Sequence, residues 1–213
     1  GDGVKSQGRK GGQGVAHIVL ENELKKWFPT DFFTGNRVLD VGAWDGFFSF
    51  YAENNGAKEV VAVDGFIWKR STSDNNISSK RGFDIGKQIF NSKVKDYIQD
   101  ITEPCKEKLG TFDSIIFAGV LYHLIHPMKA VEVLDTLVNP NGRIMLETTT
   151  ANNDMNKPMM QFHPKKSFAN DPTNYWSPNV QCVIDMFNEI GSYTVDSQNH
   201  DGHRAWMVLR KNK

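Results

Sequence analysis

The stretch from Arg37 to Asp64 reads RVLDVGAWDGFFSFYAENNGAKEVVAVD and has a glycine-containing turn after its first apolar run and an aspartate after its second. The turn Gly42-Ala43-Trp44-Asp45-Gly46 permits close backbone approach to a ligand, because glycine carries no Cβ. Asp64 lies roughly 20 residues beyond it, where a carboxylate can accept hydrogen bonds from both hydroxyls of a ribose. These residues predict an adenosine-type ligand. The glycine spacing of a dinucleotide site is missing, which favours a ligand without phosphates. The alternative is a generic turn whose glycines serve only the backbone.

A second acidic position, Asp100, follows the predicted strand at 93–98 and precedes Ile101. A carboxylate at such a strand end can accept a hydrogen bond from the exocyclic amine of adenine, while the next backbone N–H reaches a ring nitrogen. An aspartate that only starts a turn is the alternative. Asp100 and the backbone of Ile101 therefore predict an adenine contact beside the ribose contact at Asp64.

Side chains that transfer protons follow two later predicted strands. Tyr122 and His123 come after the fourth strand, and Glu147 lies near the end of the fifth. In open parallel sheets, ligands bind beyond the carboxyl ends of the strands. A histidine with a pKa of ~6.5 can accept a proton at neutral pH. His123 is therefore the first candidate for a general base, before Glu147 and His163, and a structural role for His123 is the alternative.

A parallel sheet is needed to bring these positions together. Short apolar runs alternate with helical periodicity along the chain, as in successive β-α-β units. The predicted strands are 38–41, 60–63, 93–98, 112–118, 143–149, 193–197 and 204–210, and the predicted helices are 15–28, the segment between the first two strands, 81–90, 127–138 and 180–190. Residues 139–142, Asn-Pro-Asn-Gly, predict a turn. The pattern predicts an α/β, Rossmann-like fold with an open, mostly parallel seven-stranded sheet and helices on both faces.

Composition narrows the class of protein. The 213 residues suffice for one domain, and 25 basic residues balance 25 acidic ones, so no overall basic field favours nucleic acid, although a local patch is still possible. Cys105 and Cys182 lie far apart without metal-ligand spacing, which favours a reducing, cytoplasmic compartment and no metal site. No apolar run reaches the ~18 residues of a membrane span, and the start of the chain does not resemble a signal peptide.

Two segments outside the strand and helix pattern are expected near the site. Residues 1–14 are either a flexible tail or a lip that orders over bound ligand, with Lys5 offering positive charge to an anionic substrate. The long connection 150–177 predicts a substrate-side insertion in a single domain of residues 15–213, because such connections are usually functional or disordered. Trp68 and Trp176 are expected either to stack on a planar group or to pack in the core.

The motifs resemble those of a known family. Asp40-x-Gly42 with Gly46 resembles the first motif of class I methyltransferases that use S-adenosylmethionine (SAM). The run FDSIIFAGVLYHLIHPMKAV, followed by NGRIMLET, is similar to part of the wobble-uridine tRNA methyl- and carboxymethyltransferases. Shorter relatives of these enzymes carry D-x-G-x-x-D-G-F and W-x-P-N, matched here by Asp40, Gly42, Asp45, Gly46 and Phe47 and by Trp176, Pro178 and Asn179. The resemblance spans roughly residues 37–210 and implies the class I methyltransferase fold, SAM as cofactor and S-adenosylhomocysteine (SAH) as product.

The resemblance also implies roles for single residues. In the family, the glycine turn passes under the methionine part of SAM and an acid matching Asp64 holds the ribose. In the carboxymethyltransferases, a Tyr and an Arg that match Tyr122 and Arg204 contact the carboxylate of carboxy-SAM. The expected cofactor-binding residues are Asp40, Gly42, Ala43, Trp44, Asp45, Gly46, Asp64, Gly65, Asp100, Ile101, Ala118, Gly119 and Tyr122, and the expected substrate-binding residues are Lys5, Trp68, His163, Trp176 and Arg204.

Methyl transfer is an in-line displacement at a sulfonium carbon, so the protein has to align the acceptor, exclude water and, where needed, remove a proton. The expected reaction is methylation of an oxygen or nitrogen atom of a small molecule or modified nucleoside, with His123, Tyr122 and Glu147 as catalytic candidates. The alternatives are carboxymethylation of tRNA wobble uridine with carboxy-SAM, and a SAM-binding domain without catalysis.

Overall fold

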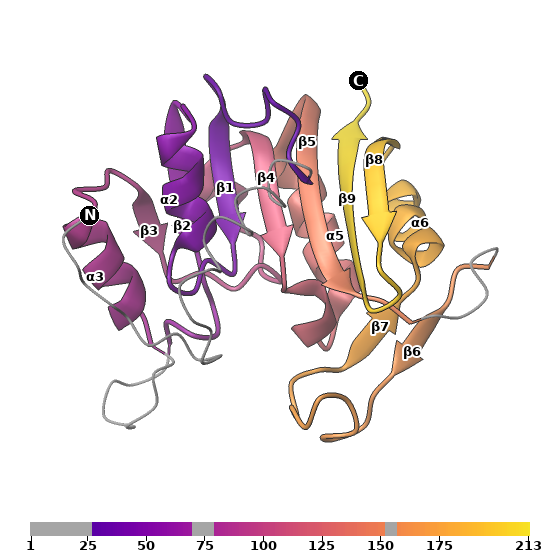
Figure 1. Cartoon of the computed structure of the whole chain (residues 1–213). Helices are drawn as coiled ribbons and strands as arrows, with labels where there is room; N and C mark the ends of the chain where they lie inside the picture. The colour runs from indigo at the N-terminus through magenta and orange to yellow at the C-terminus, as the bar shows by residue number, and fades with distance from the viewer. Residues whose placement is uncertain (1–26, 70–78, 152–156) are drawn as a thin grey trace.

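A seven-stranded sheet organises the part of the chain that the computed structural model describes, residues 27–69, 79–151 and 157–213. The strand order is β3-β2-β1-β4-β5-β9-β8 (Figure 1). Strands β1 to β5 are parallel, and β9 pairs antiparallel with both β5 and β8. The strands are β1 (Arg37–Val41), β2 (Glu59–Val63), β3 (Lys95–Tyr97), β4 (Phe112–Ala118), β5 (Val138–Thr149), β8 (Tyr193–His200) and β9 (Arg204–Lys211). The predicted open, mostly parallel sheet is confirmed.

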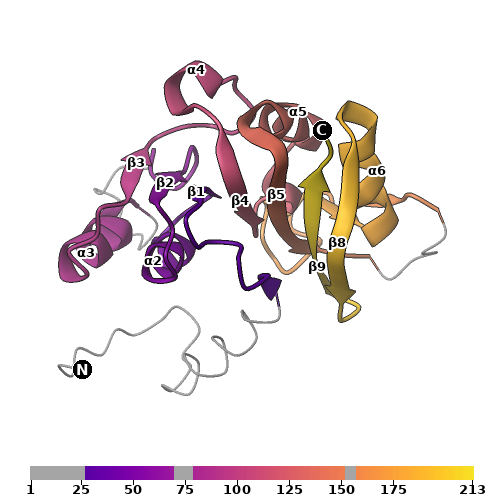
Figure 2. The ribbon, with the colours of Figure 1, turned by 90° about the horizontal axis from the view of Figure 1, so that it is seen from above.

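Helices cover both faces of this sheet (Figure 2). The helices are α2 (Phe47–Asn54), α3 (Arg81–Ile89), the short α4 (Lys106–Leu109), α5 (Pro127–Leu137) and α6 (Val180–Ile190), with a 3₁₀ turn η1 (Leu121–His123) after β4. Strand side chains alternate between the two faces. In β1, for example, Leu39 packs in a cluster with α5 and α6, whereas Val38 packs in a second cluster with α2 and α3.

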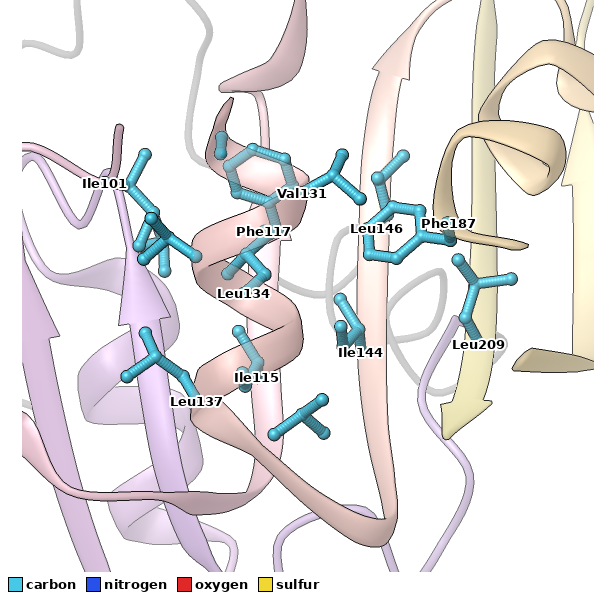
Figure 3. Close-up of a cluster of buried hydrophobic side chains, with 14 of the residues drawn as sticks. Ile101, Ile115, Phe117, Val131, Leu134, Leu137, Ile144, Leu146, Phe187 and Leu209 are labelled. Carbon is cyan, nitrogen blue, oxygen red and sulfur yellow. The ribbon is translucent and has the colours of Figure 1, made fainter. Parts of the chain in front are cut away.

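The larger cluster fixes the strands whose ends carry the candidate site. Phe117 of β4 and Leu146 of β5 pack with Leu134 of α5 and Phe187 of α6, and all four side chains are fully buried (Figure 3). Full burial of such a side chain contributes about 1.5–3 kcal/mol. The carboxyl ends of β4 and β5 are therefore held on a rigid support.

The chain departs from the sequence predictions in two places. β5 begins at Val138, because residues 139–142 form a bulge inside the strand, where the pairing shifts from Phe112↔Val138 to Ser114↔Arg143. The predicted turn is thus part of the strand. Within 150–177, the sequence analysis expected no strands, yet β6 (Met160–Phe162) and β7 (Trp176–Pro178) pair as a two-stranded sheet beyond the carboxyl ends of β4 and β5 (Figure 1).

Some predictions lie outside the described residues. They include the lip at 1–14 with Lys5, most of the predicted helix at 15–28, and parts of the loops after Asp64 and after Thr150. Among the described helices, none combines the length and the apolar character that crossing a membrane requires.

Candidate active site

The glycine turn after β1 has a backbone that only glycine adopts easily. Gly42 and Gly46 have φ angles of +73° and +83°. A Cβ added to Gly42 would overlap the Cγ2 atom of Val120, which follows β4. The turn therefore packs directly against the segment after β4, so the ends of β1 and β4 form one continuous surface. Trp44, between the glycines, also has a positive φ of 46° and its side chain is exposed.

Two acidic residues of this turn hold it in place. Asp40 is buried in β1 and its Oδ2 accepts a hydrogen bond of 2.5 Å from Ser49 Oγ in α2. Burial raises the pKa of Asp40 to about 7. The carboxylate of Asp45 lies against Gly82 at the start of α3, where a Cβ would overlap its Oδ1. Asp40 and Asp45 thus connect the turn to α2 and α3, which is compatible with an indirect role in cofactor binding.

Asp64 lies beside the glycine turn, as its predicted ribose contact requires, and is 4% exposed. Its Oδ1 accepts the backbone N–H groups of Phe66 and Ile67, at 2.9 and 2.7 Å. Its Oδ2 accepts only the N–H of Trp44 among the described residues, at 3.2 Å. Because a carboxylate oxygen has two acceptor positions, Oδ2 retains one for a ligand hydroxyl.

The predicted adenine contact lies next to Asp64. The segment after β2 touches the segment after β3, since a Cβ on Gly65 would overlap the backbone of Asp100. Asp100 Oδ1 accepts from the N–H and the hydroxyl of Thr102, at 2.9 and 2.8 Å, while Oδ2 has no partner among the described residues. Ile101 is buried in the larger cluster, so only its backbone faces a ligand. The two acids lie side by side and each retains an acceptor position.

Ala118, Gly119 and Tyr122 continue this surface after β4. Gly119 has a φ of +72°, and its N–H donates to the carbonyl of Glu147 in β5 at 3.0 Å. Within the described part of the chain, a Cβ on Gly119 would meet only Tyr122 Oη and Glu147 Oε2, at 3.8 and 3.9 Å. The space in front of Gly119 is therefore bounded by two predicted site residues.

Glu147 and Arg204 form an ion pair across the β5–β9 ladder. Arg204 Nη2 donates to Glu147 Oε2 at 2.6 Å, and Nε donates to Oε1. The guanidinium lies 5.1 Å from the centre of the Tyr122 ring. Burial disfavours the charge on Arg204, but the bonds with Glu147 outweigh it and raise the pKa of the guanidinium above its ordinary value. The guanidinium is therefore charged at neutral pH, and both carboxylate oxygens of Glu147 are committed to this pair.

His123 lies against Tyr122, with ring centres 4.1 Å apart. Its Nδ1 is 3.0 Å from the carbonyl oxygen and 3.0 Å from the hydroxyl of Thr173. A carbonyl only accepts, so Nδ1 carries the proton and Nε2 has a free lone pair in the neutral ring. Burial lowers the pKa of His123. His123 is therefore neutral at pH 7 and can accept a proton.

The two candidate tryptophans pack against protein side chains. Trp68 is 4% exposed, lies 4.7 Å from the Phe83 ring and donates from Nε1 to the Trp44 carbonyl at 2.8 Å. Trp68 therefore packs in the core, which is the second of the two expectations for this residue. Trp176 in β7 packs on Phe162 in β6 at 5.1 Å, and its buried Nε1 has no hydrogen-bond partner among the described residues. Binding of substrate by either ring stays a prediction.

A cavity of about 670 Å³ lies at the same sheet edge, between β6, the end of β5 and the turn joining β8 to β9. Its lining includes His163, Thr150, Phe168, Ser177, Asp201 and His203. Sequence reasoning identified only His163 among these. The others come from four separate segments that no motif connects, so only the long connection 150–177 gave a signal for them.

Comparisons with known proteins identify a family. The family described as "Methyltransferase domain" matches residues 16–190. The tRNA U34 carboxymethyltransferase of Actinobacillus succinogenes is 26% identical over 157 residues, which are 72% of this chain and 44% of that protein. The chain thus spans less than half the length of this curated relative.

Solved structures share the fold. A SAM-dependent methyltransferase from Mesorhizobium loti has a TM-score of 0.66 at 12% identity and covers 89% of this chain and 96% of its own. The N-terminal domain of EvdMO1, solved with SAH and D-fucose, has a TM-score of 0.66 at 16% identity and covers 99% of this chain and 90% of its own.

The residues present fit SAM. Gly119 leaves room for a ligand at the end of β4, while Asp64 and Asp100 retain acceptor oxygens for a ribose and an adenine. The match over 16–190 covers most of the chain, and the solved structures share its fold. The chain therefore belongs to the methyltransferase-domain family, and it has the fold of class I methyltransferases.

Proposed function

We propose that this domain transfers a methyl group from SAM to an oxygen or nitrogen atom of a small molecule or modified nucleoside. The observation that carries the proposal is the contact between the glycine turn and the segment after β4. Gly42 packs on Val120, and Tyr122, His123 and Arg204 lie immediately beyond it. The glycine turn at 42–46 and the segment after β4 form a donor cradle. This donor cradle and a group that accepts protons therefore occupy one edge of the sheet.

When bound, SAM supplies a methyl group on a sulfonium centre, whose thioether product leaves readily. The protein contributes position and proton acceptance. Nε2 of His123 has the lone pair to take the proton that the acceptor loses, because Thr173 holds the proton on Nδ1. Glu147 is less suited to this role, since both its oxygens bind Arg204. Tyr122 bounds the space in front of Gly119 and can orient the acceptor.

Carboxymethylation of tRNA wobble uridine is the second candidate. The relatives named tRNA U34 carboxymethyltransferase favour it, as does the proximity of Arg204 to Tyr122. A donor carboxylate at this position would have to compete with Glu147 for the guanidinium, which favours SAM. If RNA is the substrate, RNA binding should weaken steeply with salt. Absent RNA binding at low salt would remove this candidate.

Calorimetry with SAM, SAH and carboxy-SAM tests the donor. We expect SAM and SAH to bind, and Asp100→Asn to weaken both, because the amide replaces the free Oδ2 while its oxygen keeps the bonds to Thr102. Asp84→Asn, on the exposed side of α3, is the control. No SAM or SAH binding by the wild type would end the proposal.

Turnover requires a second experiment. Isotopically labelled SAM is incubated with metabolite and tRNA fractions of a cell extract, and the label is followed into each fraction. Transfer by the wild type that is lost in His123→Asn supports the catalytic reading. Binding of SAM without transfer to any fraction would favour the non-catalytic alternative.

A further inference from the structure

The cavity between β6, the end of β5 and the β8–β9 turn has a polar group that lacks a partner. The Oγ1 atom of Thr150 is buried and has no hydrogen-bond partner among the described residues, and Thr150, 9% exposed, lines the cavity. An unsatisfied buried hydroxyl costs about 1–3 kcal/mol. A ligand group in the cavity can satisfy this hydroxyl. The cavity volume of about 670 Å³ is within the range of small-molecule sites.

His163 lines this cavity, and its hydrogen bonds determine which ring nitrogen has the lone pair. The hydroxyl of Thr149 donates to the Trp176 carbonyl at 3.1 Å, so Ser177 has to donate to Thr149 across the 3.2 Å contact between their hydroxyls. Ser177 then accepts from Nε2 of His163 at 2.8 Å. The proton of the neutral ring is therefore on Nε2, and Nδ1 has the lone pair.

The walls favour a flat, uncharged or cationic ligand. His163 stacks on Phe168 with ring centres 4.6 Å apart and an interplanar angle of 21°, and Phe162 lines the same cavity. Asp201 is the only lining carboxylate, and no Lys or Arg is among the described lining residues. Hydrogen bonds from the N–H groups of Arg204 and His203 lower the pKa of Asp201, which is therefore ionised at neutral pH. An anionic ligand would meet a negative charge without a compensating cation.

The cavity and the donor cradle share strands. Thr150 follows Glu147 by three residues, and His203 directly precedes Arg204. The carbonyl of Tyr122 accepts the N–H of Tyr175, which connects η1 to the start of β7. We propose that the cavity binds the methyl acceptor, and that this acceptor is a small neutral or cationic ring compound that donates a hydrogen bond to Nδ1 of His163. The inference rests on the proposed function and names its substrate class.

Three quinolines of similar size serve as probes, measured by calorimetry in the presence of SAH. 4-Hydroxyquinoline has a donor, 4-methoxyquinoline lacks it, and quinoline-4-carboxylate is an anion. The wild type should bind 4-hydroxyquinoline at least tenfold more tightly than the other two. Absence of 4-hydroxyquinoline binding, or equal binding of the carboxylate, would overturn the inference.

Two variants test the named groups. His163→Phe retains a ring but no lone pair, and Thr150→Val retains the shape but no hydroxyl. Each should weaken 4-hydroxyquinoline binding about tenfold and leave SAH binding unchanged, while His200→Phe, on an exposed residue of β8 outside the cavity, should change neither. Unchanged probe binding in both cavity variants contradicts the inference. SAH binding in the same samples shows that a variant is folded. If the wild type does not bind SAH, the result counts against the proposed function and not against this inference.

Discussion

Replacement of Gly42 by alanine separates the two reasons for a glycine in the cradle. One reason is the backbone, with φ at +73°, and the other is the side chain of Val120, whose Cγ2 occupies the position of a Cβ. Gly35 has nearly the same φ, +74°, but a Cβ there would meet no atom of the described residues within 4 Å. Gly35→Ala is therefore a matched control that has the backbone effect alone.

The magnitudes follow from these two contributions. A left-handed backbone costs a non-glycine residue about 1–2 kcal/mol, so Gly35→Ala should lower the free energy of unfolding by about 1 kcal/mol and Tm by about 3 °C. Overpacking adds about 1–3 kcal/mol. Gly42→Ala should therefore lose about 3 kcal/mol, which corresponds to about 9 °C.

Thermal unfolding and SAH calorimetry on the same samples give the comparison. Gly42→Ala should weaken SAH binding because Val120 and the turn have to move apart, whereas Gly35→Ala should not. Adding Val120→Ala removes Cγ2 and should restore part of the stability that Gly42→Ala loses, as a coupling in a double-mutant cycle. Equal stability losses for the two glycine variants, or no recovery with Val120→Ala, would refute the assignment of the clash.

Three further predictions concern the same edge of the sheet. Gly119→Ala should lower the free energy of unfolding by about 1 kcal/mol, because of its backbone angle alone. It should also weaken SAH binding in calorimetry, because its Cβ enters the space in front of Glu147. Unchanged SAH affinity would place the cofactor elsewhere. Arg204→Met leaves the buried carboxylate of Glu147 unpaired. Because the guanidinium is 36% exposed, screening reduces the expected loss in the free energy of unfolding to about 2 kcal/mol. Chemical denaturation should show a smaller loss for Arg210→Met, whose pair with Asp196 is on the surface, and equal losses would contradict the reasoning. Asp40 has a folded-state pKa raised to about 7 from 3.8, so its stabilising contribution is present below about pH 4 and is lost as the pH rises through 7. Asp40→Asn should therefore gain Tm relative to the wild type between about pH 4 and pH 8, and a difference that does not change with pH would count against the shift.

The sheet was predictable because its signals are local. The apolar runs that end at Val41, Val63 and Ala118 are strands in the structure, and the glycine turn between the first two has the positive φ angles that its glycines implied. Pairing between strands that are distant in the sequence was harder to predict. The turn signal at 139–142 is a bulge, because β5 pairs with β4 on both sides of it.

The candidate site was predictable where one backbone segment supplies it. Asp64 and Asp100 were identified from their positions after strands, and both lie at the same edge. The partners that define their chemistry were not identified. Arg204 pairs with Glu147 only because β9 runs antiparallel to β5, and this register is absent from the local sequence pattern.

The histidines show why protonation cannot be inferred from spacing. In the sequence, nothing distinguishes the two ring nitrogens of His123 from those of His163. In the structure, Thr173 holds the proton of His123 on Nδ1, while Ser177 and Thr149 place that of His163 on Nε2. The free lone pairs are therefore on opposite ring nitrogens, Nε2 of His123 and Nδ1 of His163. The residues that decide this are Thr149 at the end of β5, Thr173 in the connection after β6 and Ser177 in β7, so the second histidine acquires a role only once those segments have folded together.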